Sequence, residues 1–208
     1  ATGTGGFVAS NYNITYVPYS GTVSKANLFI TANNATKPYG ITQSTPVTGS
    51  TAFSTLGLIP SETIGSVTLT YGLGALAASA PVGSTSTITP SAAIGGTFNI
   101  NNYTVSYVAG TLTVVSASIT VTATGPLKTY GTALTTGVSS TNFTVSGSLL
   151  SGESITSVTL TPNAAGLSAT TAAGLNYVVT PSAATGTGGF VASNYNITYV
   201  PYSGTVSK

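Results

Sequence analysis

The side chains with the greatest capacity for chemistry in this sequence are two matched pairs of charged residues, Lys37 with Glu62 and Lys128 with Glu153. Each Lys and Glu could form an ion pair or be solvated separately, and an exposed ion pair contributes about 0 to 1 kcal/mol. A second possibility is a Lys–Asn isopeptide bond promoted by the Glu. A domain under mechanical load would gain from such a covalent link, because the chain has no Cys for disulfides. The loss of one ammonia per bond in the intact mass would reveal it.

Catalysis and metal binding have few candidate residues. His and Cys are absent, and both acidic residues are Glu, so the chain contains no Asp. General acid–base and nucleophilic catalysis need a group that titrates or is activated near neutral pH. Calcium sites need several carboxylates around one ion. We therefore predict no catalytic residue, no cofactor and no bound metal.

Tyrosines and asparagines offer sites for recognition and modification. Tyr12 and Tyr16 share one face of an expected strand, which favours packing in a core. Tyr19 and Tyr202 are expected in a longer loop and are candidates for contact with glycans. Asn-X-Thr sequons for N-glycosylation occur at Asn13, Asn34, Asn102, Asn142 and Asn196. A sequence rich in Asn and Thr produces such matches readily, so they matter only in an organism that uses this sequon.

The composition argues against two classes of partner. Charged residues make up 3% of the 208 residues and the net charge is +2, so there is no basic stripe for nucleic acid or for an anionic membrane surface. No apolar run approaches the roughly 20 residues needed to span a bilayer. Residues 1–10 lack the basic and apolar regions of a signal peptide. We expect any signal peptide or anchor to lie outside this sequence.

Two nested repeats divide the chain. Residues 1–25 and 184–208 are identical, which sets a period of 183 positions (184 minus 1). A looser repeat recurs after 91 positions (128 minus 37), as in the KPYG sequence at 37–40 and the KTYG sequence at 128–131. Such self-similarity is typical of repeat arrays. We expect the parent protein to repeat the 183-residue unit.

The repeats predict three parts: the C-terminal strands of a preceding repeat (1–25), a first β domain (26–117) and a second β domain (118–208).

Short alternating segments between Gly, Pro, Asn and Ser indicate β-strands. In 118–123, Ile119, Val121 and Ala123 fall on one face and two threonines on the other. We expect six or seven short strands per domain, a hairpin turn at Ala109-Gly110 and no convincing helix. The predicted fold is all-β, with tandem small β-sandwich (Ig-like) or β-grasp-like domains arranged end to end.

Three motifs in a fixed order resemble one protein family. A first strand ITVTA at 119–123 is followed by K-x-Y-G at 128–131, and NYTVSYVAGTLTV at 102–114 closes the first domain. This order resembles the MBG repeat family, the Y-G type related to YDG repeats. The family occurs in very long bacterial surface adhesins of filamentous-haemagglutinin type and of gliding Bacteroidota. It usually has an Asp after Y-G, where this sequence has Ile41 or Thr132.

The resemblance covers both domains and implies a secreted spacer or adhesive module at the cell surface, without enzymatic chemistry. The leading hypothesis is a stalk segment of a long extracellular adhesin or surface filament that projects a binding tip, with neighbouring copies of the repeat as partners. One alternative is a repeat that binds glycans or solid surfaces weakly and gains avidity from its number. Another is a filament subunit in which residues 1–25 insert as a donor strand into a neighbour.

Overall fold

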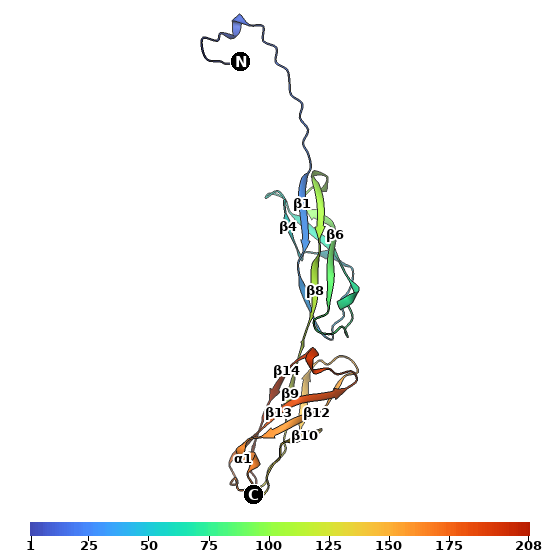
Figure 1. The fold of residues 1–208 in the computed structure, drawn as a ribbon, viewed down its shortest axis with the longest axis vertical. Helices are drawn as coiled ribbons and strands as arrows, with labels where there is room; N and C mark the ends of the chain where they lie inside the picture. The colour runs from blue at the N-terminus through green and yellow to red at the C-terminus, as the bar shows by residue number, and fades with distance from the viewer.

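A computed structural model describes residues 1–208, which are nearly all-β with 48% strand and 8% helix. The prediction of an all-β chain is confirmed. Figure 1 shows an elongated molecule in which two groups of strands follow one another along the long axis. We call β1 to β8 the N-terminal strand group and β9 to β15 the C-terminal strand group. No strand of one group pairs with a strand of the other.

The strand bounds reflect the internal repeat. The N-terminal strand group contains β1 (Ala26–Ala32), β2 (Ala35–Pro38), β3 (Val47–Ser50), β4 (Phe53–Leu56), β5 (Ile64–Tyr71), β6 (Thr85–Gly96), β7 (Tyr103–Val108) and β8 (Gly110–Val115). The C-terminal strand group contains β9 (Ala117–Ala123), β10 (Gly137–Ser139), β11 (Phe143–Gly147), β12 (Ser154–Pro162), β13 (Asn176–Thr187), β14 (Tyr195–Val200) and β15 (Tyr202–Thr205). The one α-helix, α1 (Ala164–Leu167), and four short 3-10 helices, at Ala9–Asn11, Leu73–Ala75, Ile100–Asn102 and Ala192–Asn194, complete the elements.

Each strand group contains two sheets of corresponding order. The N-terminal group has the sheets β4-β1-β7 and β2-β8-β6-β5-β3, and the C-terminal group has β11-β9-β14 and β10-β12-β13-β15. In each three-stranded sheet the first strand of the group pairs in parallel with a strand near its end, β1 with β7 and β9 with β14. The start and the end of each group therefore lie side by side.

The hairpin expected at Ala109-Gly110 is wrong. β7 and β8 belong to different sheets, so the chain crosses from one sheet to the other at this point. The equivalent β14 and β15 also separate, and Tyr202 begins β15 instead of lying in a longer loop. Alternation identified these segments as strands, but a period of two does not say which strand is the partner. Gly110 is required for close packing, because a Cβ there would lie 2.4 Å from the carbonyl oxygen of Ala32.

Alternating apolar side chains form the core. Ile119, Val121 and Ala123, predicted to share a face, are all buried. In the N-terminal strand group, Leu28 from one sheet and Leu69 from the other belong to the same buried cluster. Burying such a side chain contributes about 1.5 to 3 kcal/mol. The apolar faces of the two sheets therefore shield each other from water.

Residues 1–25 stand apart from both groups. They contain one 3-10 helix and no strand, and they extend away from the N-terminal strand group (Figure 1). The identical residues 184–208 form the end of β13, a 3-10 helix, β14 and β15. Val23 is fully exposed, whereas its copy Val206 is only 2% exposed. This sequence forms strands where a strand group supplies pairing partners, as expected for short strands with little stability of their own.

Candidate functional site at the junction of the strand groups

The two strand groups meet at a tightly connected junction. Ser116 is the only residue between β8 and β9. Across this short link, Ile119 and Tyr195 of the C-terminal group belong to the hydrophobic cluster that forms the N-terminal core. Leu150 and Phe190 pack against the same cluster. Apolar contact therefore continues from one group into the next.

A single carboxylate connects the two groups at this junction. The hydroxyl of Tyr39, just after β2, donates a hydrogen bond to Oε1 of Glu153 at 2.7 Å. The hydroxyl of Tyr195, the first residue of β14, donates to Oε2 of the same Glu153. The two rings meet edge to face with centroids 5.4 Å apart. Hydrogen bonds to an ionised acceptor are roughly twice as strong as neutral ones, so Glu153 is a strong bridge.

Backbone groups complete the junction. The N–H of Val82 in the N-terminal strand group donates to Oδ1 of Asn194 in the C-terminal group at 3.2 Å. The N–H of Leu150 donates to the Tyr195 hydroxyl at 3.0 Å, so this hydroxyl both donates and accepts. Direct polar contacts therefore hold the two groups together at two separate points.

The K-x-Y-G motif builds the turn that presents Tyr39. Lys37 is only 2% exposed, and its ammonium donates to the carbonyl oxygens of Ile41 and, at 2.8 Å, Ala77. Burial lowers the pKa of Lys37. Gly40 has φ +86°, a left-handed conformation that favours glycine. The Lys thus fixes the inside of the turn, the Gly lets it close, and the Tyr between them faces the next group.

The motif recurs in the C-terminal strand group. Lys128 is buried, and its ammonium donates to the carbonyl oxygen of Thr132. Gly131 has φ +87°, nearly the same as in the first copy. Tyr130, however, is 57% exposed, whereas Tyr39 is buried.

Glu62 is the residue of the N-terminal strand group that is equivalent to Glu153. Its Oε2 accepts from the Tyr103 hydroxyl, which in turn accepts from the N–H of Ile59 at 3.3 Å. The hydrogen bond to Glu62, together with burial, raises the pKa of Tyr103. Oε1 of Glu62 has no protein donor, whereas Glu153 uses both of its oxygens.

Burial and the Glu153 carboxylate both raise the pKa values of Tyr39 and Tyr195. Burial, followed by the hydrogen bond to Glu153, raises the pKa of Tyr195 to about 12. The same two causes raise the pKa of Tyr39. A phenolate here would lie beside a carboxylate, so the neutral hydroxyls are favoured well above the ordinary tyrosine range.

We expect stability to fall as the pH rises above 10. The ordinary tyrosine pKa is 10. Below this pH the tyrosine is protonated in both the folded and the unfolded chain, so the raised pKa of Tyr195 does not change the free energy of unfolding. Between pH 10 and about 12 the unfolded chain releases the Tyr195 proton while the folded chain keeps it, so stability falls by about 1.4 kcal/mol per pH unit. Urea unfolding at stepped pH measures this loss. Tyr39→Phe should remove part of the slope, and the exposed Tyr19→Phe should leave it unchanged.

The lowered pKa of Lys37 has the opposite effect on the pH dependence of stability. A lowered pKa means that the folded chain releases its proton before the unfolded chain does, so stability rises with pH up to the ordinary value of 10.5. Its contribution is constant above that value, so the fall above pH 11 reports the tyrosines.

The predicted charged pairs have different partners in the structure. The hydrogen bonds of Lys37 and Lys128 go to backbone carbonyls, and those of Glu62 and Glu153 go to tyrosines. No hydrogen bond joins Lys to Glu within a pair. The Lys–Asn isopeptide bond stays a prediction for an intact-mass measurement.

The predicted recognition and modification residues are spread over the molecule. Tyr19 is almost fully exposed, whereas Tyr202 is half-buried against Tyr177, with ring centroids 6.1 Å apart. The structure therefore gives these two tyrosines different surroundings. Glycan contact by either one stays a prediction.

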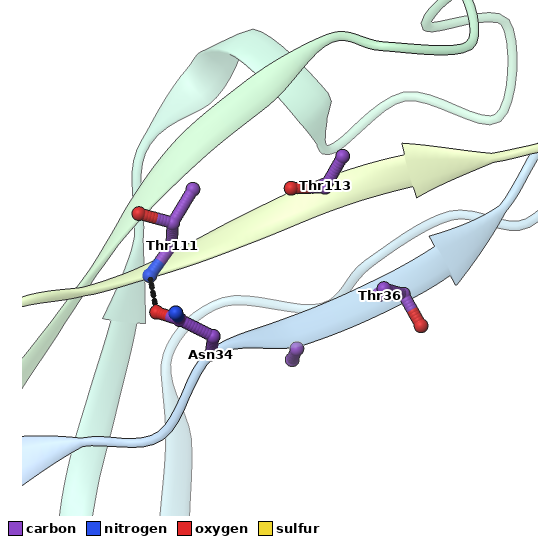
Figure 2. Close-up of a pocket in the computed structure, with 5 residues that line it drawn as sticks. Asn34, Thr36, Thr111 and Thr113 are labelled. Atoms are coloured by element: carbon purple, nitrogen blue, oxygen red, sulfur yellow. Dashed lines mark hydrogen bonds between the residues drawn. The ribbon is translucent and has the colours of Figure 1, made fainter.

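The sequon asparagines also differ in their surroundings. Asn13, Asn102 and Asn196 are exposed, and Asn142 is half-buried. Figure 2 shows Asn34 at an open hollow beside Thr111 and Thr113 of β8, where its Oδ1 accepts the Thr111 N–H at 2.8 Å. Glycosylation at any of these positions stays a prediction.

The tyrosine partners of Glu62 and Glu153 were not predicted from the sequence. Tyr39 was visible in the K-x-Y-G motif, and Tyr103 and Tyr195 were visible in the closing motif of each repeat. Their recurrence with one Glu per repeat was the available signal. Nothing local to any of them indicated that they converge.

Comparison with known proteins adds the family. Residues 28–113 match the family model of the MBG domain (YGX type). The N-terminal strand group is an MBG domain. The match includes the Tyr39-Gly40 turn and Glu62, and the MBG family is found in adhesin-like surface proteins and is not an enzyme family. No curated protein and no solved structure matches the chain.

The matched MBG domain has a structural counterpart in the C-terminal strand group. This group has the same parallel pairing of its first strand with a strand near its end and the same Lys-Tyr-Gly turn. None of the helices in the structure is long and apolar enough to cross a membrane.

Proposed function

We propose that the chain is a structural segment of a long extracellular bacterial adhesin or surface filament, which projects a binding tip from the cell. Its parts are two compact β domains, 26–117 and 118–208, set end to end, and residues 1–25 as the final strands of a preceding repeat. Each domain of this size would add roughly 3 to 4 nm of reach. The function is mechanical and needs no catalytic residue.

One observation carries this proposal. Residues 1–25 and 184–208 have the same sequence, and in the second copy this sequence provides β14 and β15, one strand for each sheet. The first copy has no strand group to complete and is exposed. A preceding domain of the same kind would give it its partners, which is the arrangement of a covalent array.

The junction between the MBG domain and the C-terminal strand group supports a role in bearing load. A one-residue link, shared apolar packing and the Tyr39–Glu153–Tyr195 bridge all oppose bending between the groups. The surface of the MBG domain, rich in Ser and Thr, would keep the array hydrated with few charges.

The length and mass of the native protein test the proposal. Material sheared from cells should run on a denaturing gel as one chain of several hundred kilodaltons and appear in electron micrographs as thin beaded fibres. A small subunit that forms ladders or dissociates would instead indicate non-covalent assembly.

Donor-strand assembly is the second candidate, favoured by the exposed and unpaired residues 1–25. In that arrangement these residues would insert into a neighbouring subunit. Against it, the C-terminal strand group of this chain already contains its own copy of the strands at 195–205. Dissociation of native fibres into short chains under denaturing conditions would favour it over the covalent array.

Weak binding of glycans or solid surfaces by each repeat is the other alternative, and the exposure of Tyr19 is compatible with it. Binding of the 208-residue chain to a glycan array, lost on Tyr19→Ala and Tyr202→Ala substitution, would favour this alternative. The stalk proposal expects no such binding.

A further inference from the structure

The C-terminal end of the molecule presents a junction turn without a partner. Tyr130 stands 91 positions after Tyr39, and its turn is held by the same buried Lys and left-handed Gly. At the internal junction Tyr39 is 5% exposed, but Tyr130 is 57% exposed. The turn is thus shaped for contact although nothing covers it.

The N-terminal end presents the matching acceptor surface. Glu62 is held by Tyr103 as Glu153 is held by Tyr195, and its Oε1 is free. Asn102, equivalent to the buried Asn194, is exposed. Ile59, equivalent to the partly buried Leu150, is 49% exposed.

Residues 1–25 indicate which partner covers the acceptor surface around Glu62. Lys25 and Ala26 line the same hollow as Ile59 and Asn102, so residues 1–25 leave the molecule from this face. These residues have the sequence that ends the C-terminal strand group. A strand group completed by residues 1–25 would therefore lie directly against Glu62.

We propose that the C-terminal end of one copy of this chain docks on the N-terminal end of the next copy, with the Tyr130 hydroxyl donating to Oε1 of Glu62. The proposal deepens the proposed function and rests on it, because it specifies the second of two junctions that alternate along the array. The backbone N–H of Ala173, equivalent to that of Val82, would donate to Oδ1 of Asn102. A glycan on the Asn102 sequon would block this contact.

The contact is head to tail, with different surfaces on its two sides. Such an interface leaves one free donor end and one free acceptor end after every addition, so it continues along an open array. Each Glu would then bridge its own closing tyrosine and the turn tyrosine of the preceding domain. The K-x-Y-G turn would thereby form the polar contact that holds each domain against the next.

A chain of two periods makes this junction intramolecular. Residues 26–208 are added after Lys208, which recreates the Lys25–Ala26 connection because residues 1–25 and 184–208 are identical. Tyr130→Phe is placed in the first copy and Glu62→Gln in the second, singly and together, and urea unfolding gives the coupling between them. The matched control places Tyr130→Phe in the second copy and Glu62→Gln in the first, at opposite ends of the array.

The adjacent arrangement should show coupling of about tenfold in the unfolding equilibrium constant, typical of residues in direct contact. The control arrangement should be additive. Additivity in the adjacent arrangement would overturn the proposed contact between Tyr130 and Glu62. The stalk proposal is tested separately by native mass, so a long covalent chain with additive substitutions would retain the stalk and remove only this contact.

Discussion

Replacing Glu153 by Ala is expected to lower the free energy of unfolding by about 2 to 4 kcal/mol. The hydroxyls of Tyr39 and Tyr195 both donate to this carboxylate and both tyrosines are buried, so the substitution leaves two donors without an acceptor. An unsatisfied buried polar group costs about 1 to 3 kcal/mol. Urea or guanidinium unfolding of the 208-residue chain measures the loss.

Glu62→Ala is the matched control, because Glu62 accepts from Tyr103 alone. It should cost about half as much, in proportion to the number of hydroxyls that lose their acceptor. Glu153→Gln keeps the shape and one carbonyl acceptor, and should fall between the wild type and Glu153→Ala. Equal losses for Glu153→Ala and Glu62→Ala would show that the bridge between the groups adds nothing to stability.

Lys37→Ala is expected to lower the free energy of unfolding by about 2 to 4 kcal/mol and to loosen the turn that presents Tyr39. The substitution leaves the carbonyl oxygen of Ile41 without its donor, leaves that of Ala77 with the Ala80 N–H alone, and removes a packed four-carbon stem. Chemical unfolding measures the first effect. A lower titration midpoint for Tyr39, followed by phenolate absorbance, measures the second.

Two variants separate the causes of this loss. Lys37→Met retains the stem and relieves the cost of burying a charge, so it should lose about half as much as Lys37→Ala. Lys25→Ala removes an exposed Lys and should change stability by less than about 0.5 kcal/mol. A loss at Lys25 as large as at Lys37 would contradict the structural role given to the buried ammonium.

Local sequence signals predicted the strands but not their partners. Alternation at 118–123 is a property of neighbouring residues, so the buried face of β9 could be read directly. The pairing of β1 with β7 joins segments far apart in sequence, and the crossing between sheets at Ala109 depends on that pairing. The short helix α1 was also missed, although Asn163 caps it by accepting the Gly166 N–H at 3.0 Å.

The candidate site could be predicted in its residue types but not in its contacts. Lys37 and Glu62 stood out because charged residues are so rare here, yet their partners are carbonyls and a tyrosine. Electrostatic attraction between the two charges is the simple expectation. The fold instead places the Lys inside a turn and the Glu at the end of its group, so each charge is satisfied where it lies.

The length of arrays of one, two and three periods, measured by small-angle X-ray scattering, is the most direct test of a stiff stalk. Fixed junctions predict that the maximum dimension grows by a constant increment, roughly 6 to 8 nm for each added pair of domains. Growth that falls off with each added period, as in a flexible chain, would contradict a stiff stalk held by its junctions.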